Sequence, residues 1–137
     1  MIIGIIGSMQ FAEEMLEYKR KLELMGHSAI TSGFVDSFID KNEEEKEKIK
    51  IEQKNNDDAM KRDIERMRNA DGFLVLNFDK HGINNYIGGN AFLEMGFAHV
   101  DNKKIYLLNP IPEIAVFKTE IEAMKPIIIN DDLAKII

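Results

Sequence analysis

The residue in the most unusual chemical setting along this sequence is Glu94. Positions 87–99 carry apolar residues at helical spacing, and Glu94 falls on the apolar face of the expected helix. That face also carries Ile87, Ala91 and Ala98. A carboxylate against an apolar surface costs free energy unless another group pairs with it or uses it. Glu94 is therefore either a reactive group or a glutamate that forms a salt bridge or extends along the surface to reach water.

A second carboxylate, Asp63, has a similar setting. It lies three residues after Met60 and four before Met67, so helical spacing turns it toward the core. The alternative is an ion pair with a neighbouring cation, Lys61, Arg62 or Arg66. Two carboxylates that meet in one cleft suit cleavage at an anomeric carbon, because one attacks as the nucleophile while the other handles a proton or orients the sugar.

Two polar segments are candidates for ligand binding. Gly7 and Ser8 end an apolar run, and a hydroxyl with free backbone N–H groups at a helix N-terminus suits a phosphate or another polar group. The turn matches neither GxGxxG nor a Walker A pattern, so an ordinary strand–helix turn is an equal alternative. The loop 77–89 carries Asp79 and a polar tip, and it either binds a ligand or is only a hydrophilic connection.

The elements that must position these residues alternate between strands and helices. Short apolar runs predict strands at 2–6, 27–31, 73–76, 104–108 and 126–129, and helical patterns lie at 8–26, 42–70, 87–99 and 114–124. This alternation predicts an α/β fold with a mainly parallel sheet of about five strands. Ligands bind such sheets beyond the carboxyl ends of the strands, where both polar segments and the helix of Glu94 should meet. The charged half of 42–70 is expected to be a solvated helix or a mobile excursion.

Composition narrows the class of protein. The 137 residues predict a single domain, 1–137. The net charge of −6 disfavours polymeric nucleic acid and anionic membranes as partners. There is no cysteine, and the three histidines do not have metal-ligand spacing, so no metal site is expected. No apolar run is long enough to span a membrane, which predicts a soluble, cytoplasmic protein.

Three sequence motifs carry a resemblance to a known family. G-S-M begins at Gly7, D-I-x-x-M-x-x-A-D begins at Asp63, and G-G-N-A-F-L-E-M-G-F-A begins at Gly88. In this order they resemble the nucleoside 2-deoxyribosyltransferases and the related 2′-deoxynucleoside 5′-phosphate N-hydrolases. The E-M-G-F-A element with its upstream aspartate is the most specific part of the match.

The resemblance implies a fold, an activity and a set of site residues. It implies a flavodoxin-like three-layer fold and an enzyme that acts at the N-glycosidic bond of a 2′-deoxynucleoside or its 5′-monophosphate, without a cofactor. Glu94 corresponds to the nucleophile that forms a covalent deoxyribosyl-enzyme, and Asp63 to the aspartate that contacts the sugar or assists proton transfer. The expected substrate-binding residues are Gly7, Ser8, Gln10, Asp79, Gly88, Gly89 and Asn90. Family members are homo-oligomers, dimers or larger, whose neighbouring subunits often complete the site.

The sequence also differs from the family pattern. Gln10 stands where the phosphate-hydrolysing members carry an arginine, and the loop before Glu94 is longer and more polar than usual. A catalytically silent nucleotide-binding or sensing module on the same fold is therefore the alternative function. A flavin-binding relative of flavodoxin is a third, although 7–11 offers only one hydroxyl where such phosphate loops are rich in serine and threonine.

Overall fold

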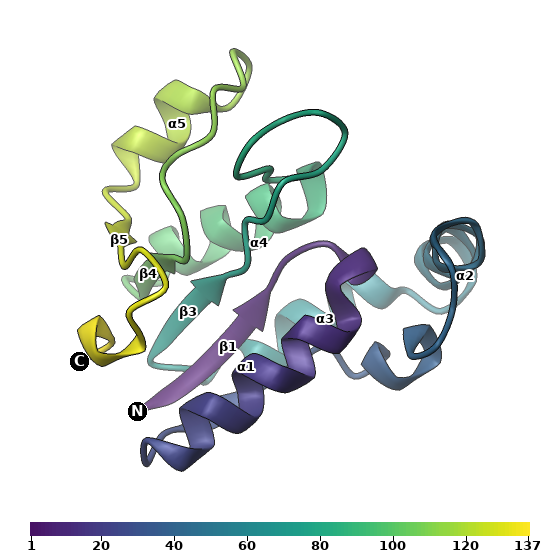
Figure 1. Cartoon of the computed structure of the whole chain (residues 1–137), viewed down its shortest axis with the longest axis horizontal. Helices are drawn as coiled ribbons and strands as arrows, with labels where there is room; N and C mark the ends of the chain where they lie inside the picture. Colours follow the sequence, from purple (N-terminus) through teal and green to yellow (C-terminus); the bar gives the residue numbers. More distant parts are fainter.

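The computed structural model describes all residues, 1–137, and its centre is one parallel β-sheet (Figure 1). Its strands are β1 (Ile2–Ile6), β2 (Ser28–Ile30), β3 (Gly72–Val75), β4 (Lys104–Leu107) and β5 (Ile127–Ile128). They lie in the order β2-β1-β3-β4-β5, and every neighbouring pair is parallel. This is the strand order of flavodoxin-like folds, so the predicted fold class is confirmed.

Five α-helices surround the sheet: α1 (Ala12–Leu24), α2 (Glu43–Asn56), α3 (Ala59–Met67), α4 (Gly89–Val100) and α5 (Lys118–Ala123). Short 3-10 turns lie at Met9–Phe11, Val35–Phe38 and Leu133–Lys135. No helix has the length and apolar character needed to cross a membrane.

The core has two parts because successive side chains of a strand point to opposite faces of the sheet. Ile3 and Ile5 of β1 pack with Met15 and Leu22 of α1 on one face. Ile6 belongs to the other face, which the side chains of α3, α4 and α5 cover. Helices on both faces of the sheet give the expected three layers.

The expected helix over 42–70 is two helices. Asp58, which precedes α3, has a φ of 52° and lies in the left-handed region, so the helical hydrogen-bond pattern stops there. The charged half of this segment is the regular helix α2, of which Lys46 is the one buried residue. Of the two forms expected for this half, the solvated helix is the one observed.

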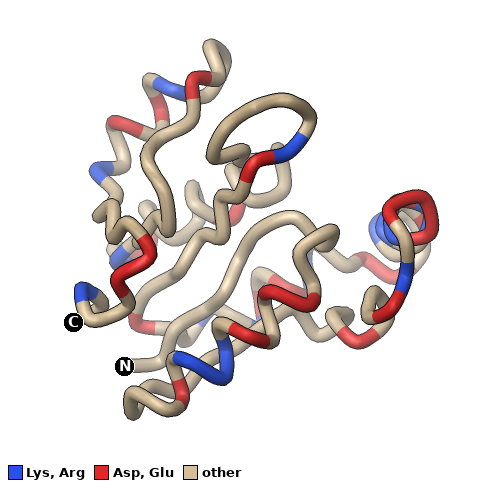
Figure 2. The backbone as a smooth tube through the Cα atoms, viewed as in Figure 1, with Lys and Arg blue, Asp and Glu red and all other residues tan.

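The start of α2 is well defined by its sequence. Asn42 and Glu45 form a capping box, in which each side chain accepts a hydrogen bond from the backbone N–H of the other residue. Acidic residues fill the first turn, where the helix dipole favours negative charge, and basic residues follow (Figure 2).

Candidate active site

The candidate site lies where the strand order reverses, at the carboxyl ends of β1 and β3. Gly7 follows β1, the loop 77–89 follows β3, and α4 begins at the end of that loop. A cavity of about 40 Å³ lies here, bordered by the end of β1 and by α2, α3 and α4. Its polar lining includes Asp63 and Glu94, so the two predicted catalytic carboxylates share one cavity.

Glu94 is buried, with 9% of its surface exposed. Its Oε1 accepts a hydrogen bond of 2.7 Å from Nδ2 of Asn90, one helical turn earlier on α4. It forms no ion pair and only 9% of its surface is exposed, so neither a salt bridge nor a side chain extended into water is observed for this glutamate. Burial, and then the negative charge of Asp63, raise the pKa of Glu94 from 4.5 to about 8, while the charge of Lys54 opposes the rise.

Asp63 is held by the turn that follows β2. Its carboxylate accepts hydrogen bonds from Oγ of Ser32 at 2.5 Å and from the backbone N–H of Gly33 at 3.1 Å. The expected alternative, an ion pair with a neighbouring cation, is wrong because Asp63 forms no ion pair. Arg66 donates to the carbonyl of Thr31, and the guanidinium of Arg62 lies over the ring of Phe34.

A second, more polar hollow of about 130 Å³ adjoins the first at the N-terminus of α4. Five of the expected substrate-binding residues border it: Gly7, Ser8, Gly88, Gly89 and Asn90. Ser8 caps the 3-10 turn through its Oγ, which also accepts a hydrogen bond of 2.8 Å from Nζ of Lys80. The hydroxyl and the free N–H groups of the first turn of α4 therefore border one space beside a cation.

Two of the expected substrate-binding residues, Asp79 and Gln10, border neither the cavity of Glu94 nor the polar hollow beside α4. The Asp79 carboxylate accepts the backbone N–H of Asn85 at 2.9 Å and so stabilises the loop 77–89 from within. The Gln10 side chain donates to the carbonyl of Glu43 at 3.1 Å and so contacts the first turn of α2. Both side chains are engaged in local structure.

Three lysines at the site were missed by sequence reasoning. Lys50 and Lys54 of α2 and Lys80 of the loop border the hollow beside α4, and the first two also line the cavity of Glu94. Burial lowers the pKa of Lys54 and of Lys80, and the charge of Lys50 lowers both further. The missed signal was the spacing of Lys46, Lys50 and Lys54, which places all three on one face of a helix that begins at a capping box.

Asn90 connects the two parts of the site. Its Nδ2 donates a hydrogen bond to Glu94, but its Oδ1 is buried and has no hydrogen-bond partner. A buried acceptor without a donor is costly, and such an atom beside a cavity is suited to accept a hydrogen bond from a ligand hydroxyl or amine.

Comparison with known proteins adds no relative to these observations. No protein-family model matches the chain, and a search of curated proteins found no match. The function is therefore argued from the residues of the site and from the motifs that carry the resemblance.

Proposed function

We propose that this protein is a nucleoside deoxyribosyltransferase or a deoxynucleoside 5′-phosphate N-glycosidase, with Glu94 as the nucleophile. The observation that carries the proposal is the shared cavity of Glu94 and Asp63 at the carboxyl edge of the sheet. The charge of Asp63 acts on the ionisation of Glu94, which supports a functional pair rather than two unrelated acids.

In the proposed reaction, ionised Glu94 attacks the anomeric carbon of the deoxyribose. A bond forms between a Glu94 oxygen and C1′ as the bond from C1′ to the base nitrogen breaks, and the base leaves with the electron pair and takes up a proton. Asp63 orients the sugar or assists that proton transfer. Attack by water on the covalent intermediate completes hydrolysis, and attack by a second base completes transfer.

The polar hollow beside α4 favours the 5′-monophosphate over the free nucleoside. A helix N-terminus, the hydroxyl of Ser8 and the ammonium groups of Lys50 and Lys80 are donors that bind a phosphate. These lysines would supply the positive charge that an arginine at position 10 provides in the phosphate-hydrolysing members. The unpartnered Oδ1 of Asn90 would accept a hydrogen bond from the sugar. We place this activity in the cytoplasm, where nucleotides are made and used.

The test is release of free base from a panel of deoxynucleosides and their 5′-monophosphates, with and without an acceptor base, followed by chromatography. We expect release by the wild type and a loss of at least about a thousandfold in Glu94→Gln. Asp63→Asn should be severely slowed. Glu120→Gln, which changes an exposed glutamate of α5, is the matched control and should retain full activity. Unchanged release by correctly folded Glu94→Gln would exclude the nucleophile role.

One observation favours the alternative, a catalytically silent nucleotide-binding module. A glutamate with a pKa of about 8 is mostly protonated at neutral pH, and a protonated carboxyl is a poor nucleophile. Stabilisation by a deoxynucleotide in a thermal-shift assay, with no base released by any pair of donor and acceptor, would support this module.

A further inference from the structure

We propose that Lys54 of α2 is a positioning residue for Glu94. The ammonium group of Lys54 stabilises the ionised carboxylate of Glu94, which the negative charge of Asp63 disfavours. This inference rests on the proposed function, because it explains how a buried nucleophile can ionise. The resemblance assigns no role to α2.

The ion pairs of α2 distinguish Lys54 from the other lysines of that helix. Lys46 contacts Glu13 at 2.6 Å, Lys48 contacts Glu44 at 3.7 Å and Lys50 contacts Glu47 at 2.8 Å. Lys54 forms no ion pair, although it lines the same cavity as Glu94 and Asp63. A half-buried ammonium group without a carboxylate partner therefore lies at the edge of the cavity that holds Glu94 and Asp63.

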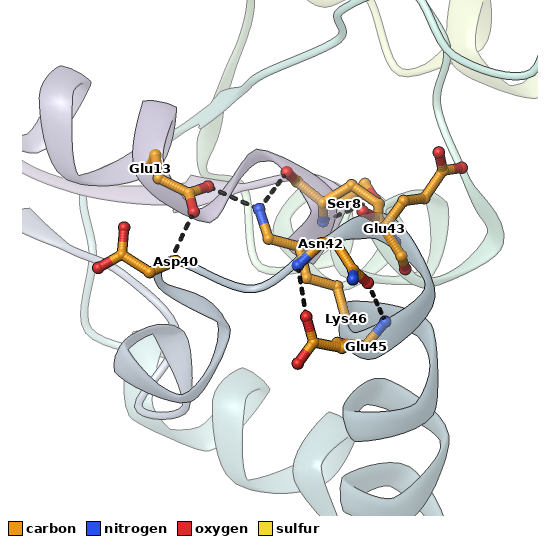
Figure 3. A network of polar contacts seen from close by, with 8 residues as sticks. Ser8, Glu13, Asp40, Asn42, Glu43, Glu45 and Lys46 are labelled. Carbon is orange, nitrogen blue, oxygen red and sulfur yellow. Dashed lines mark hydrogen bonds and ion pairs between the residues drawn. The ribbon is translucent and has the colours of Figure 1, made fainter.

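The contacts that hold the start of α2 explain why Lys54 lies at the cavity. Lys46 is 6% exposed, and its ammonium group contacts the Glu13 carboxylate at 2.6 Å (Figure 3). The same ammonium group donates to the backbone carbonyl of Gln10 at 2.9 Å. The backbone N–H of Asp40 donates to the same Glu13 carboxylate, so the chain entering α2 is held at the same place. Lys54 follows Lys46 by eight residues and therefore projects from the same face of the helix, over the cavity.

The charged groups around Glu94 come from three helices. On α4 its direct partner is the neutral Asn90, on α3 it faces Asp63, and on α2 it faces Lys50 and Lys54. On its other side Glu94 borders a small hollow whose charged lining residues are Arg68, Asp101 and Lys103. The charges of Lys54 and Glu94 favour each other's ionised forms: Lys54 lowers the pKa of Glu94, and Glu94 raises that of Lys54.

The experiment compares Lys54→Met, Lys54→Arg and the matched control Lys48→Met, an exposed lysine six residues earlier on the same helix. The ionisation of Glu94 is followed directly, by NMR of the side-chain carboxyl carbon in labelled protein without substrate. We expect the Glu94 midpoint to move to higher pH in Lys54→Met and to stay near the wild-type value in Lys54→Arg and Lys48→Met. Base release at neutral pH should fall about three- to tenfold in Lys54→Met and recover in Lys54→Arg.

The outcomes separate this proposal from the proposed function. A Glu94 midpoint unchanged in Lys54→Met, or moved equally by Lys48→Met, overturns the role of Lys54 whatever the activity. A shifted midpoint in a protein that releases no base supports the Lys54–Glu94 interaction and contradicts the enzyme. Lys54→Gln, which keeps a polar side chain without the charge, replaces Lys54→Met if that variant does not fold.

Discussion

Glu94 combines two opposing requirements in one carboxyl group. Burial favours its neutral form, whereas attack on an anomeric carbon requires the anion. With a pKa of about 8, about a tenth of the molecules carry the anion at pH 7. The positive charge that develops on the sugar during bond cleavage would stabilise that anion as the reaction proceeds.

The pH dependence of base release follows from this ionisation. We expect the rate to rise with pH through about 8, as Glu94 loses its proton. Asp63→Asn removes a negative charge that opposes ionisation, so its slower reaction should begin to rise at lower pH than that of the wild type. Measurement of kcat/KM against pH for both proteins checks this. A rate that falls through the same range would instead indicate that protonated Glu94 acts as an acid.

The stability of the folded protein should also depend on the ionisation of Glu94, but it should fall with rising pH where the rate of base release rises. Because the pKa of Glu94 is higher in the folded state than its ordinary 4.5, the folded protein binds the proton more tightly, and stability falls as pH rises from about 4.5 to 8. Glu94→Gln removes this loss and can still accept the hydrogen bond from Asn90. We expect the variant to be more stable than the wild type above pH 8, by on the order of 1–3 kcal/mol, and nearly equal at pH 5.

Urea unfolding of Glu94→Gln and wild type at both pH values measures this difference. Glu120→Gln again serves as the exposed control and should behave as the wild type at each pH. A Glu94→Gln variant with no advantage at high pH would mean that Glu94 ionises freely in the folded protein.

At the scale of elements, α2 is attached to the rest of the protein largely by polar contacts. Lys46 is its only buried residue, and Ile49 is its one side chain packed against the core. The helix nevertheless covers the cavity of Glu94, whose volume of about 40 Å³ is far below the roughly 300 Å³ of an ordinary small-molecule site. Entry of the proposed nucleotide substrate would therefore require α2 to move.

The pair Lys46–Glu13 should show an asymmetric response to mutation. Glu13→Gln leaves a buried cation without its carboxylate, whereas Lys46→Met leaves Glu13, which is 43% exposed and can be hydrated. We expect losses of about 2 kcal/mol and about 1 kcal/mol respectively, and faster hydrogen exchange of the α2 amides in both variants. Urea unfolding and hydrogen exchange measure the two effects. Equal losses would show that the cation gains another partner.

The predictions from sequence were most accurate for the strands and helices whose positions follow from the spacing of apolar residues. The five apolar runs became the five strands, and the alternation with helices predicted the sheet. The break at Asp58 was missed, because it depends on one backbone conformation that an aspartate adopts in only some contexts. Lys50 and Lys54 were missed because a charged run is usually a solvated face, and only the packing of α2 turns one side of it toward the cavity.

At the scale of the whole molecule, α4 carries an apolar outer face opposite its packed side. Leu93, Phe97 and Val100 are 48%, 48% and 76% exposed, and they border a shallow apolar hollow together with Gly96 and Met124. Phe97 also borders the small hollow beside Glu94, so a second copy on this face would cover that hollow. The resemblance implies a homo-oligomer, a dimer or larger, and we propose that this protein is a dimer with α4 at its interface.

This proposal is tested with two valines of nearly equal exposure. Val100→Asp places a charge in the apolar face, and Val116→Asp places the same charge outside α4 and outside the lining of its apolar hollow, at a residue that is 75% exposed. We expect sedimentation to show dimers for the wild type and Val116→Asp, and monomers for Val100→Asp. Dimers that persist in Val100→Asp would assign the interface to another surface.

The most direct test of the central claim is detection of the covalent intermediate. The protein is mixed with a reactive deoxynucleoside 5′-monophosphate, quenched rapidly in acid and examined by intact-protein and peptide mass spectrometry. We predict a deoxyribosyl phosphate adduct on the peptide that contains Glu94, absent from Glu94→Gln and present in Glu120→Gln. Base release by the wild type with no adduct at any reaction time, or with an adduct on another residue, would contradict Glu94 as the nucleophile.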